Sequence, residues 1–153
     1  MAYLTSLISA SENSVFNFRQ NISTSIQASK VNYCSHLIAY WIKIQPLGSL
    51  LSEAIDRGKI LSEIIGHPLR PPIWHDVESV KTLSNKLENT WRELIAEKGE
   101  FPDDDWGKIE IQKVLDIFQY ASKNDETIIS ILDLNNFNTE SKRRIKIPVV
   151  LKI

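Results

Sequence analysis

The segment from Gly66 to Val77, GHPLRPPIWHDV, most constrains the fold, because three of its twelve residues are proline. Proline has no amide hydrogen to donate and disfavours helical geometry in the residue before it, so no continuous helix can cross this segment. Directly after it, apolar residues recur at every third or fourth position, and Asp76 stands where an N-cap residue accepts an amide hydrogen bond. We therefore predict an extended crossover followed by the longest helix of the chain, with one face formed by Val77, Val80, Leu83, Leu87, Trp91, Leu94 and Ile95.

Four further segments show the same helical period, which gives about five helices. The first is predicted to begin after Ser11 and to extend to Ile26, and the second to cover residues 31–41 before Pro46. A third helix fits residues 47–57, where Gly58 takes the position of a left-handed C-terminal cap. The last begins at Trp106, after the acidic triplet 103–105.

Three segments favour strands. Residues 1–9 are short and apolar, although Leu4 and Ile8 also fit a helical spacing. Residues 127–132 form a β-branched run, and residues 145–153 alternate between apolar and polar positions, with Pro148 favouring a sheet edge. The sequence thus predicts an α+β fold, about five helices on a sheet of three or more strands, in one domain over residues 1–153. Strand order and direction remain open.

Composition narrows the class of protein. A chain of 153 residues that is 42% hydrophobic can bury a substantial core, and a net charge of -1 fits neither a polycation nor a disordered polyanion. Cys34 is the single cysteine, which excludes an intramolecular disulfide and fits a reducing cytoplasm. The longest apolar run, residues 37–42, is far shorter than the roughly 20 residues of a membrane span. We expect a cytoplasmic protein without a transmembrane helix.

The proline segment also holds the candidate catalytic residues His67, Arg70, His75 and Asp76. Two histidines and a carboxylate could bind a metal, and a histidine beside an aspartate could act as a base and its orienting group. However, the histidines lie eight residues apart where no continuous helix aligns them, so a structural role, with Asp76 as a helix cap, is the favoured interpretation. Because no cofactor or metal motif occurs, we predict neither.

Pro71, Pro72 and Trp74 are the candidate binding residues of the same segment. Paired prolines favour the stiff polyproline geometry that partner proteins recognise, whereas most tryptophans cover a core, which is the favoured alternative here. The basic residues Lys142, Arg143, Arg144, Lys146 and Lys152 lack an aromatic stacking platform, so nucleic acid is not the expected partner. A protein partner is expected, and the oligomeric state is left open.

The stretches LLSEAIDRGKILSEIIGHPLRPPIWHDVESVKTLSNKL and LDIFQYASKNDETIISIL resemble the YfbM-like family of small bacterial proteins. Matching positions are the turn residues Ala54, Ile55, Gly58 and Leu61, the helix residues Val77, Val80 and Leu87, and later Phe118, Ala121 and Ile128 to Ile131. The resemblance implies a small α+β fold and a bacterial protein, and it brings no established activity.

Two functions follow as expectations. The first is a noncatalytic protein-binding or regulatory module, of which an immunity protein would be one form, because no set of residues converges on a reaction. The second is a small hydrolase or metal-dependent enzyme that uses His67, Arg70, His75 and Asp76. That second function requires these four side chains to meet in one cleft.

Overall fold

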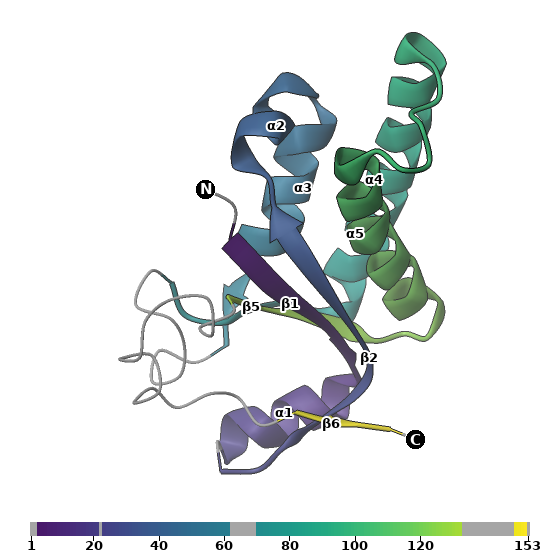
Figure 1. Cartoon of the computed structure of the whole chain (residues 1–153). Coiled ribbons are helices and arrows are strands. Elements are labelled where there is room, and N and C mark those ends of the chain that lie inside the picture. Colours follow the sequence, from purple (N-terminus) through teal and green to yellow (C-terminus); the bar gives the residue numbers. More distant parts are fainter. Residues whose placement is uncertain (1–2, 22, 62–69, 133–148, 153) are drawn as a thin grey trace.

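A computed structural model of the chain describes residues 3–21, 23–61, 70–132 and 149–152. Within these ranges the predicted α+β fold is confirmed, with five helices and a six-stranded sheet (Figure 1). The elements in chain order are β1 (Tyr3–Ala10), α1 (Glu12–Gln20), β2 (Ile26–His36), α2 (Ile38–Lys43), α3 (Leu47–Asp56), β3 (Lys59–Ile60), β4 (Ile73–His75), α4 (Val77–Lys98), α5 (Trp106–Lys123), β5 (Thr127–Leu132) and β6 (Val149–Leu151).

The strand order of the sheet is β3-β4-β5-β1-β2-β6. Neighbouring strands are antiparallel except for β6, which pairs with the start of β2 in parallel. The strands predicted at residues 1–9 and 127–132 correspond to β1 and β5. The predicted C-terminal edge strand is confirmed for its described part, β6, whereas Pro148 and the basic residues 142–146 lie outside the described residues.

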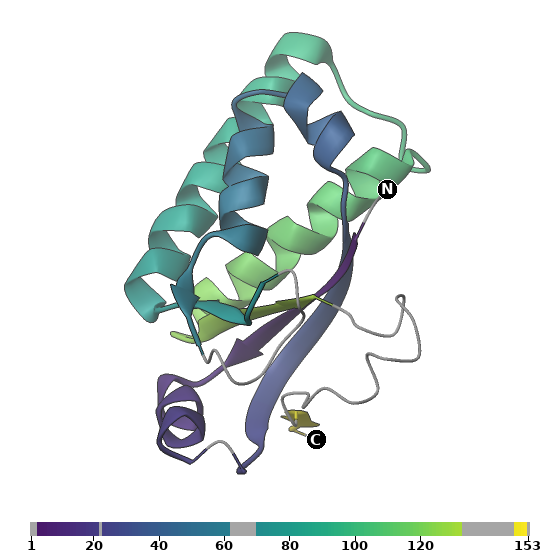
Figure 2. The same cartoon turned by 90° about the vertical axis from the view of Figure 1, so that its left-hand side faces the viewer.

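Two hydrophobic cores lie on opposite faces of the sheet. Leu7, Cys34 and Ile128 face the larger core, which α3, α4 and α5 cover. Ile8 and Ile129 are their sequence neighbours on the strands and face the smaller core under α1. Figure 2 shows α1 on one side of the sheet and the longer helices on the other. Because successive strand residues point to opposite faces, the central strands β1 and β5 contribute to both cores.

The predicted second helix, residues 31–41, is wrong over most of its length. Residues 26–36 form β2, all eight residues of β1 pair with it, and only the short α2 follows. The first helix is likewise shorter than predicted, since α1 ends at Gln20 and Ile26 begins β2. Apolar residues at every third or fourth position indicate a helix only weakly over so short a segment. Pairing with β1 outweighs that preference.

The predicted left-handed cap at Gly58 is also wrong. Arg57 caps α3 with an extended backbone, and the left-handed glycine of the described chain is Gly99, with φ of 86° at the end of α4. Gly58 is instead required for space, because a Cβ there would lie 2.6 Å from the carbonyl oxygen of Trp74. The missing side chain lets the end of α3 approach β4 closely.

Asp76 caps α4 as predicted, and Asp105 caps α5. Asp76 accepts a hydrogen bond from the amide of Ser79 at 2.9 Å, and Asp105 accepts one from the amide of Lys108 at 2.9 Å. These bonds satisfy amides that the first helical turn leaves free, and they fix where α4 and α5 begin. Among the described helices, none combines the length and apolar character that a membrane crossing needs.

Candidate functional site

Arg70 ties α3 to β5. Its guanidinium donates to the Asp56 carboxylate at 3.2 Å, to the Ile55 carbonyl at 3.2 Å and to the Ser130 hydroxyl at 3.1 Å. Burial lowers the pKa of Arg70, and the charge of Asp56 opposes that shift. A largely buried guanidinium with this many acceptors holds two elements together, so its donors are already used.

His36 joins the same group of residues, which we call the Arg70 network: His36, Asp56, Arg70 and Ser130. The Nδ1 atom of His36 lies 3.1 Å from the Asp56 carboxylate, and its ring stacks on Trp41 with centroids 4.7 Å apart. Burial lowers the pKa of His36, the Asp56 charge raises it, and the Arg70 charge lowers it further. This pairing could not be predicted from the sequence, because His36 and Asp56 are twenty positions apart and no local motif marks it.

His75 and Asp76 line a cleft of about 320 Å³ between the end of α3, β4 and the first turns of α4, which we call the polar cleft. The Nε2 atom of His75 lies 2.9 Å from the Ala54 carbonyl oxygen, and burial lowers the pKa of this histidine. Asp76 accepts a hydrogen bond from the Lys59 ammonium at 2.8 Å. Together with the hydrogen bond from the Ser79 amide, it lowers the pKa of Asp76 to about 2. Both side chains therefore have structural partners.

The candidate catalytic residues are thus divided between two places. His75 and Asp76 share the polar cleft, whereas Arg70 contacts Asp56 and is not part of the cleft lining. His67 lies outside the described residues. In the part of the chain that the structure describes, no group of three or more histidine, cysteine, aspartate or glutamate side chains is arranged to hold a metal ion.

Of the candidate binding residues, Trp74 covers the smaller core. Pro72 is buried, Pro71 is half-buried, and the half-buried Trp74 ring packs against the core under α1. Cations lie over that ring, with Arg19 at 5.6 Å and Lys59 at 5.2 Å from its centroid. Trp74 therefore presents little free aromatic surface to a partner.

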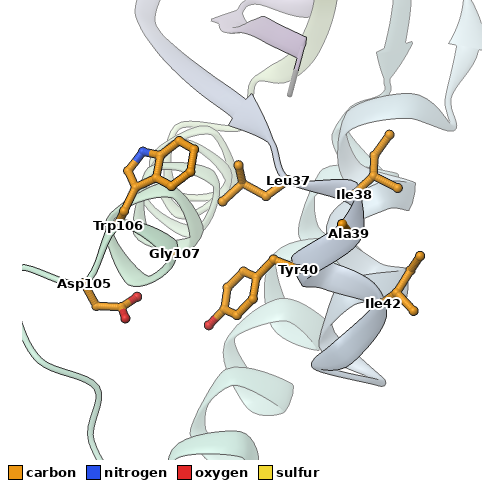
Figure 3. A pocket seen from close by; sticks show the side chains of 8 residues that line it. All are labelled: Leu37, Ile38, Ala39, Tyr40, Ile42, Asp105, Trp106 and Gly107. Carbon is orange, nitrogen blue, oxygen red and sulfur yellow. The ribbon is translucent and has the colours of Figure 1, made fainter. Parts of the chain in front are cut away.

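A larger hollow lies between α2 and the start of α5, and we call it the apolar groove. Its volume is about 800 Å³. Figure 3 shows Ile38 and Ile42 on one side, Trp106 on the other, and Leu37 and Tyr40 between them. The lining is completed by Ala39, Asp105 and Gly107. Among the described residues this is where large apolar side chains face an open hollow.

The side chains that project from the groove walls are unusually exposed for their type. The exposed fractions are 65% for Ile42, 60% for Trp106 and 44% for Ile38. Ile38 and Ile42 are four residues apart on α2 and form a ridge on one face of that helix, and Trp106 forms the ridge at the start of α5. The groove is therefore a valley between two apolar ridges.

Close helix contacts fix the two walls. A Cβ at Gly107 would lie 2.4 Å from the Tyr40 ring, and a Cβ at Gly48 would lie 1.7 Å from the Trp41 carbonyl oxygen. The two glycines therefore let α5 approach Tyr40 and let α3 approach α2. Trp41 is buried in the larger core and anchors the inner side of α2. With the inner side held, the outer ridge remains at the surface.

The α5 side of the groove is acidic. Asp105 lines the groove, and burial of Tyr40 together with the nearby Asp105 charge raises the pKa of that tyrosine. Asp103 pairs with Lys108 at 2.8 Å, whereas Asp104 beside it is exposed. No sequence motif marks the groove, because its two walls come from segments that lie far apart in the chain.

Comparison of the chain with models of protein families, with curated proteins and with solved structures gave no match. The resemblance to the YfbM-like family stays a prediction. Functional inference therefore depends on the site itself.

Proposed function

We propose that this chain is a noncatalytic protein-binding module and that the apolar groove is its binding surface. The observation that supports this proposal is the pair of apolar ridges, whose three large side chains, Ile38, Ile42 and Trp106, are each more than two-fifths exposed. Contiguous apolar surface of this kind costs free energy in water and usually marks a place where another molecule binds. Tryptophan and isoleucine side chains around a hollow also suit the central contacts of a protein interface.

The enzyme alternative has less support. A hydrolase or metal-dependent enzyme would need His75 and Asp76 as free reactive groups, but the first faces a backbone carbonyl and the second caps α4 and pairs with Lys59. Arg70 belongs to a different cluster. The enzyme alternative would be supported if the protein showed a hydrolase activity that His75→Gln abolished without lowering the thermal stability.

The binding proposal is tested by cross-linking in cells of the native host. A double variant, Ile42→Ser with Trp106→Ser, removes one large side chain from each ridge. Phe16→Ser is the matched control, because Phe16 is 59% exposed but lies on α1, away from the groove. We expect the same partner to be captured by the wild-type and control proteins and to be lost from the double variant.

Thermal melts of all three proteins should accompany the capture, so that loss of binding is not confused with loss of folding. Equal capture by the double variant and the wild-type protein would contradict the proposal. Loss of capture in the Phe16→Ser control alone would move the binding surface to α1.

A further inference from the structure

We infer that the occupant of the apolar groove is an amphipathic α-helix of a partner protein, with basic residues at the end that lies beside residues 103–105. This inference rests on the proposed function and names the class of partner. Two apolar ridges with a valley between them form the surface against which a third helix packs, with its own ridge in the valley. Ile38 and Ile42 supply one ridge, and Trp106 supplies the other.

The backbone of the groove favours a helix over an extended peptide. An extended peptide gains affinity chiefly through main-chain hydrogen bonds to an open sheet edge. The walls here are helices and not an open sheet edge, so they offer no extended row of amide and carbonyl groups for a strand to pair with. A helix satisfies its own backbone, so it can bury an apolar face against Ile42 and Trp106 without leaving polar groups unpaired.

The side chains of the groove also favour a macromolecule over a small ligand. A small-ligand site encloses most of its ligand and offers a few polar groups that fix its orientation. The ridge residues Ile42 and Trp106 instead project outward and remain more than half exposed. Of the polar groups at the groove, the Asp105 carboxylate already caps α5. A broad partner surface would cover these ridges.

Acidic residues beside the groove favour a partner helix with basic residues at one end. The loop before α5 carries Glu100, Asp103, Asp104 and Asp105, of which Asp103 has the Lys108 ammonium as its partner. The Asp105 carboxylate lines the groove and the exposed Asp104 is its sequence neighbour, so the α5 side of the groove has a negative rim. Lysine or arginine in the last turn of a partner helix would meet this rim, and charge complementarity of this kind sets orientation and partner choice.

Peptide selection gives a test that does not presuppose a helix. A displayed library of random peptides of about 16 residues, roughly 24 Å long if helical, is selected on the wild-type protein. Peptides that also bind the Ile42→Ser, Trp106→Ser double variant are discarded. We expect the enriched peptides to show apolar residues at every third or fourth position and basic residues at one end, and to gain helical circular dichroism when bound.

Affinity measurements then separate the apolar and charged contributions. For the best enriched peptide, Trp106→Ser should weaken binding by about tenfold or more, and Phe16→Ser should leave it unchanged. Asp104→Lys should weaken binding by about threefold at low salt, and this difference should shrink as salt screens the charges.

The outcomes distinguish this inference from the proposed function. Enriched peptides with an alternating period, enriched acidic peptides, or no groove-dependent peptide at all would overturn the helical, basic partner. If cross-linking to the cellular partner still required Ile42 and Trp106 in any of those cases, the proposed binding function would hold and only the helical, basic partner would be wrong. If cross-linking also failed to depend on the groove, both proposals would fall.

Discussion

The polar cleft and the apolar groove differ in how much of their side-chain chemistry the fold already uses. In the polar cleft, His75, Asp76 and Lys59 all have polar partners within 2.9 Å. In the apolar groove, Ile42 and Trp106 remain more than half exposed. The residues with the most reactive side chains therefore stabilise the structure, and the apolar ones are left available. A functional site is better recognised by what the fold leaves unsatisfied than by residue type.

Among substitutions of polar side chains, the largest loss of stability should come from the Arg70 network, whose polar groups are also used by the fold. Asp56→Ala should lower the free energy of unfolding by about 3 kcal/mol, because Arg70 would stay largely buried without its carboxylate. We expect the lower end of the range for such pairs, since the Asp56 side chain is itself 34% exposed. Urea unfolding measures the change.

Glu88→Ala is the control for that experiment, because it removes the carboxylate of the exposed pair with Arg92. Its effect should stay below about 1 kcal/mol. Equal effects of the Asp56 and Glu88 substitutions would mean that the Arg70 network contributes no more than surface charges do.

Acid should weaken the fold through its buried histidines. Burial lowers the pKa values of His36 and His75 below their ordinary 6.5, so the unfolded chain binds protons that the folded chain does not. Stability is therefore full above pH 6.5 and falls as the pH drops, by up to about 1.4 kcal/mol per pH unit for each histidine. Urea unfolding between pH 7.5 and 5 gives the slope.

Replacement of both histidines by glutamine should flatten that slope. If the double variant kept the wild-type pH dependence, other groups would carry it. If wild-type stability rose on acidification, the sign of the histidine shifts would be wrong.

Asp76→Ala should have a moderate effect, about 1 kcal/mol at pH 7, because it removes the N-cap of α4. The pKa of Asp76 is lowered to about 2, so its contribution is present above the ordinary value of 3.8 and is lost as the pH falls through about 2. Thermal unfolding followed by circular dichroism measures the loss at pH 7 and its dependence on pH.

Asp104→Ala is the matched control, because Asp104 is an exposed aspartate that does not cap α5. If both variants melted alike, the Asp76 cap would contribute little to stability.

The smallest effect on stability should come from the groove itself. Ile42→Ser and Trp106→Ser should each change the free energy of unfolding by about 0.5 kcal/mol or less, since these side chains are mostly exposed. Trp41→Ser, one residue earlier and buried, should cost about 3 kcal/mol or more. A large loss in the groove variants would show that the ridges support the fold, and the contrast between the two regions would disappear.

Much of the fold could be predicted from the sequence wherever local signals agreed. Helices α3, α4 and α5 follow their apolar periods, and Asp76 acts as the predicted N-cap of α4. The strand at β5 follows from a run of β-branched residues. In each of these segments the side chains, caps and burial favour the same structure.

The remainder depended on contacts between distant residues. The strand β2 forms because β1 pairs along it, and no residue at positions 31–36 indicates this pairing in the sequence. The same is true of His36 beside Asp56, and of the groove, whose walls come from α2 and α5.

The position of β5 affects how the protein can be made. This strand is one of the last described elements in the chain, yet it lies in the sheet between β4 and β1 and pairs with both. During synthesis β1 and β2 emerge early and can pair, whereas β4 has only the two-residue β3 beside it until Thr127 to Leu132 leave the ribosome. Nascent chains that stop before Thr127 would therefore hold two separate strand pairs with exposed edges, which quality-control chaperones and proteases recognise.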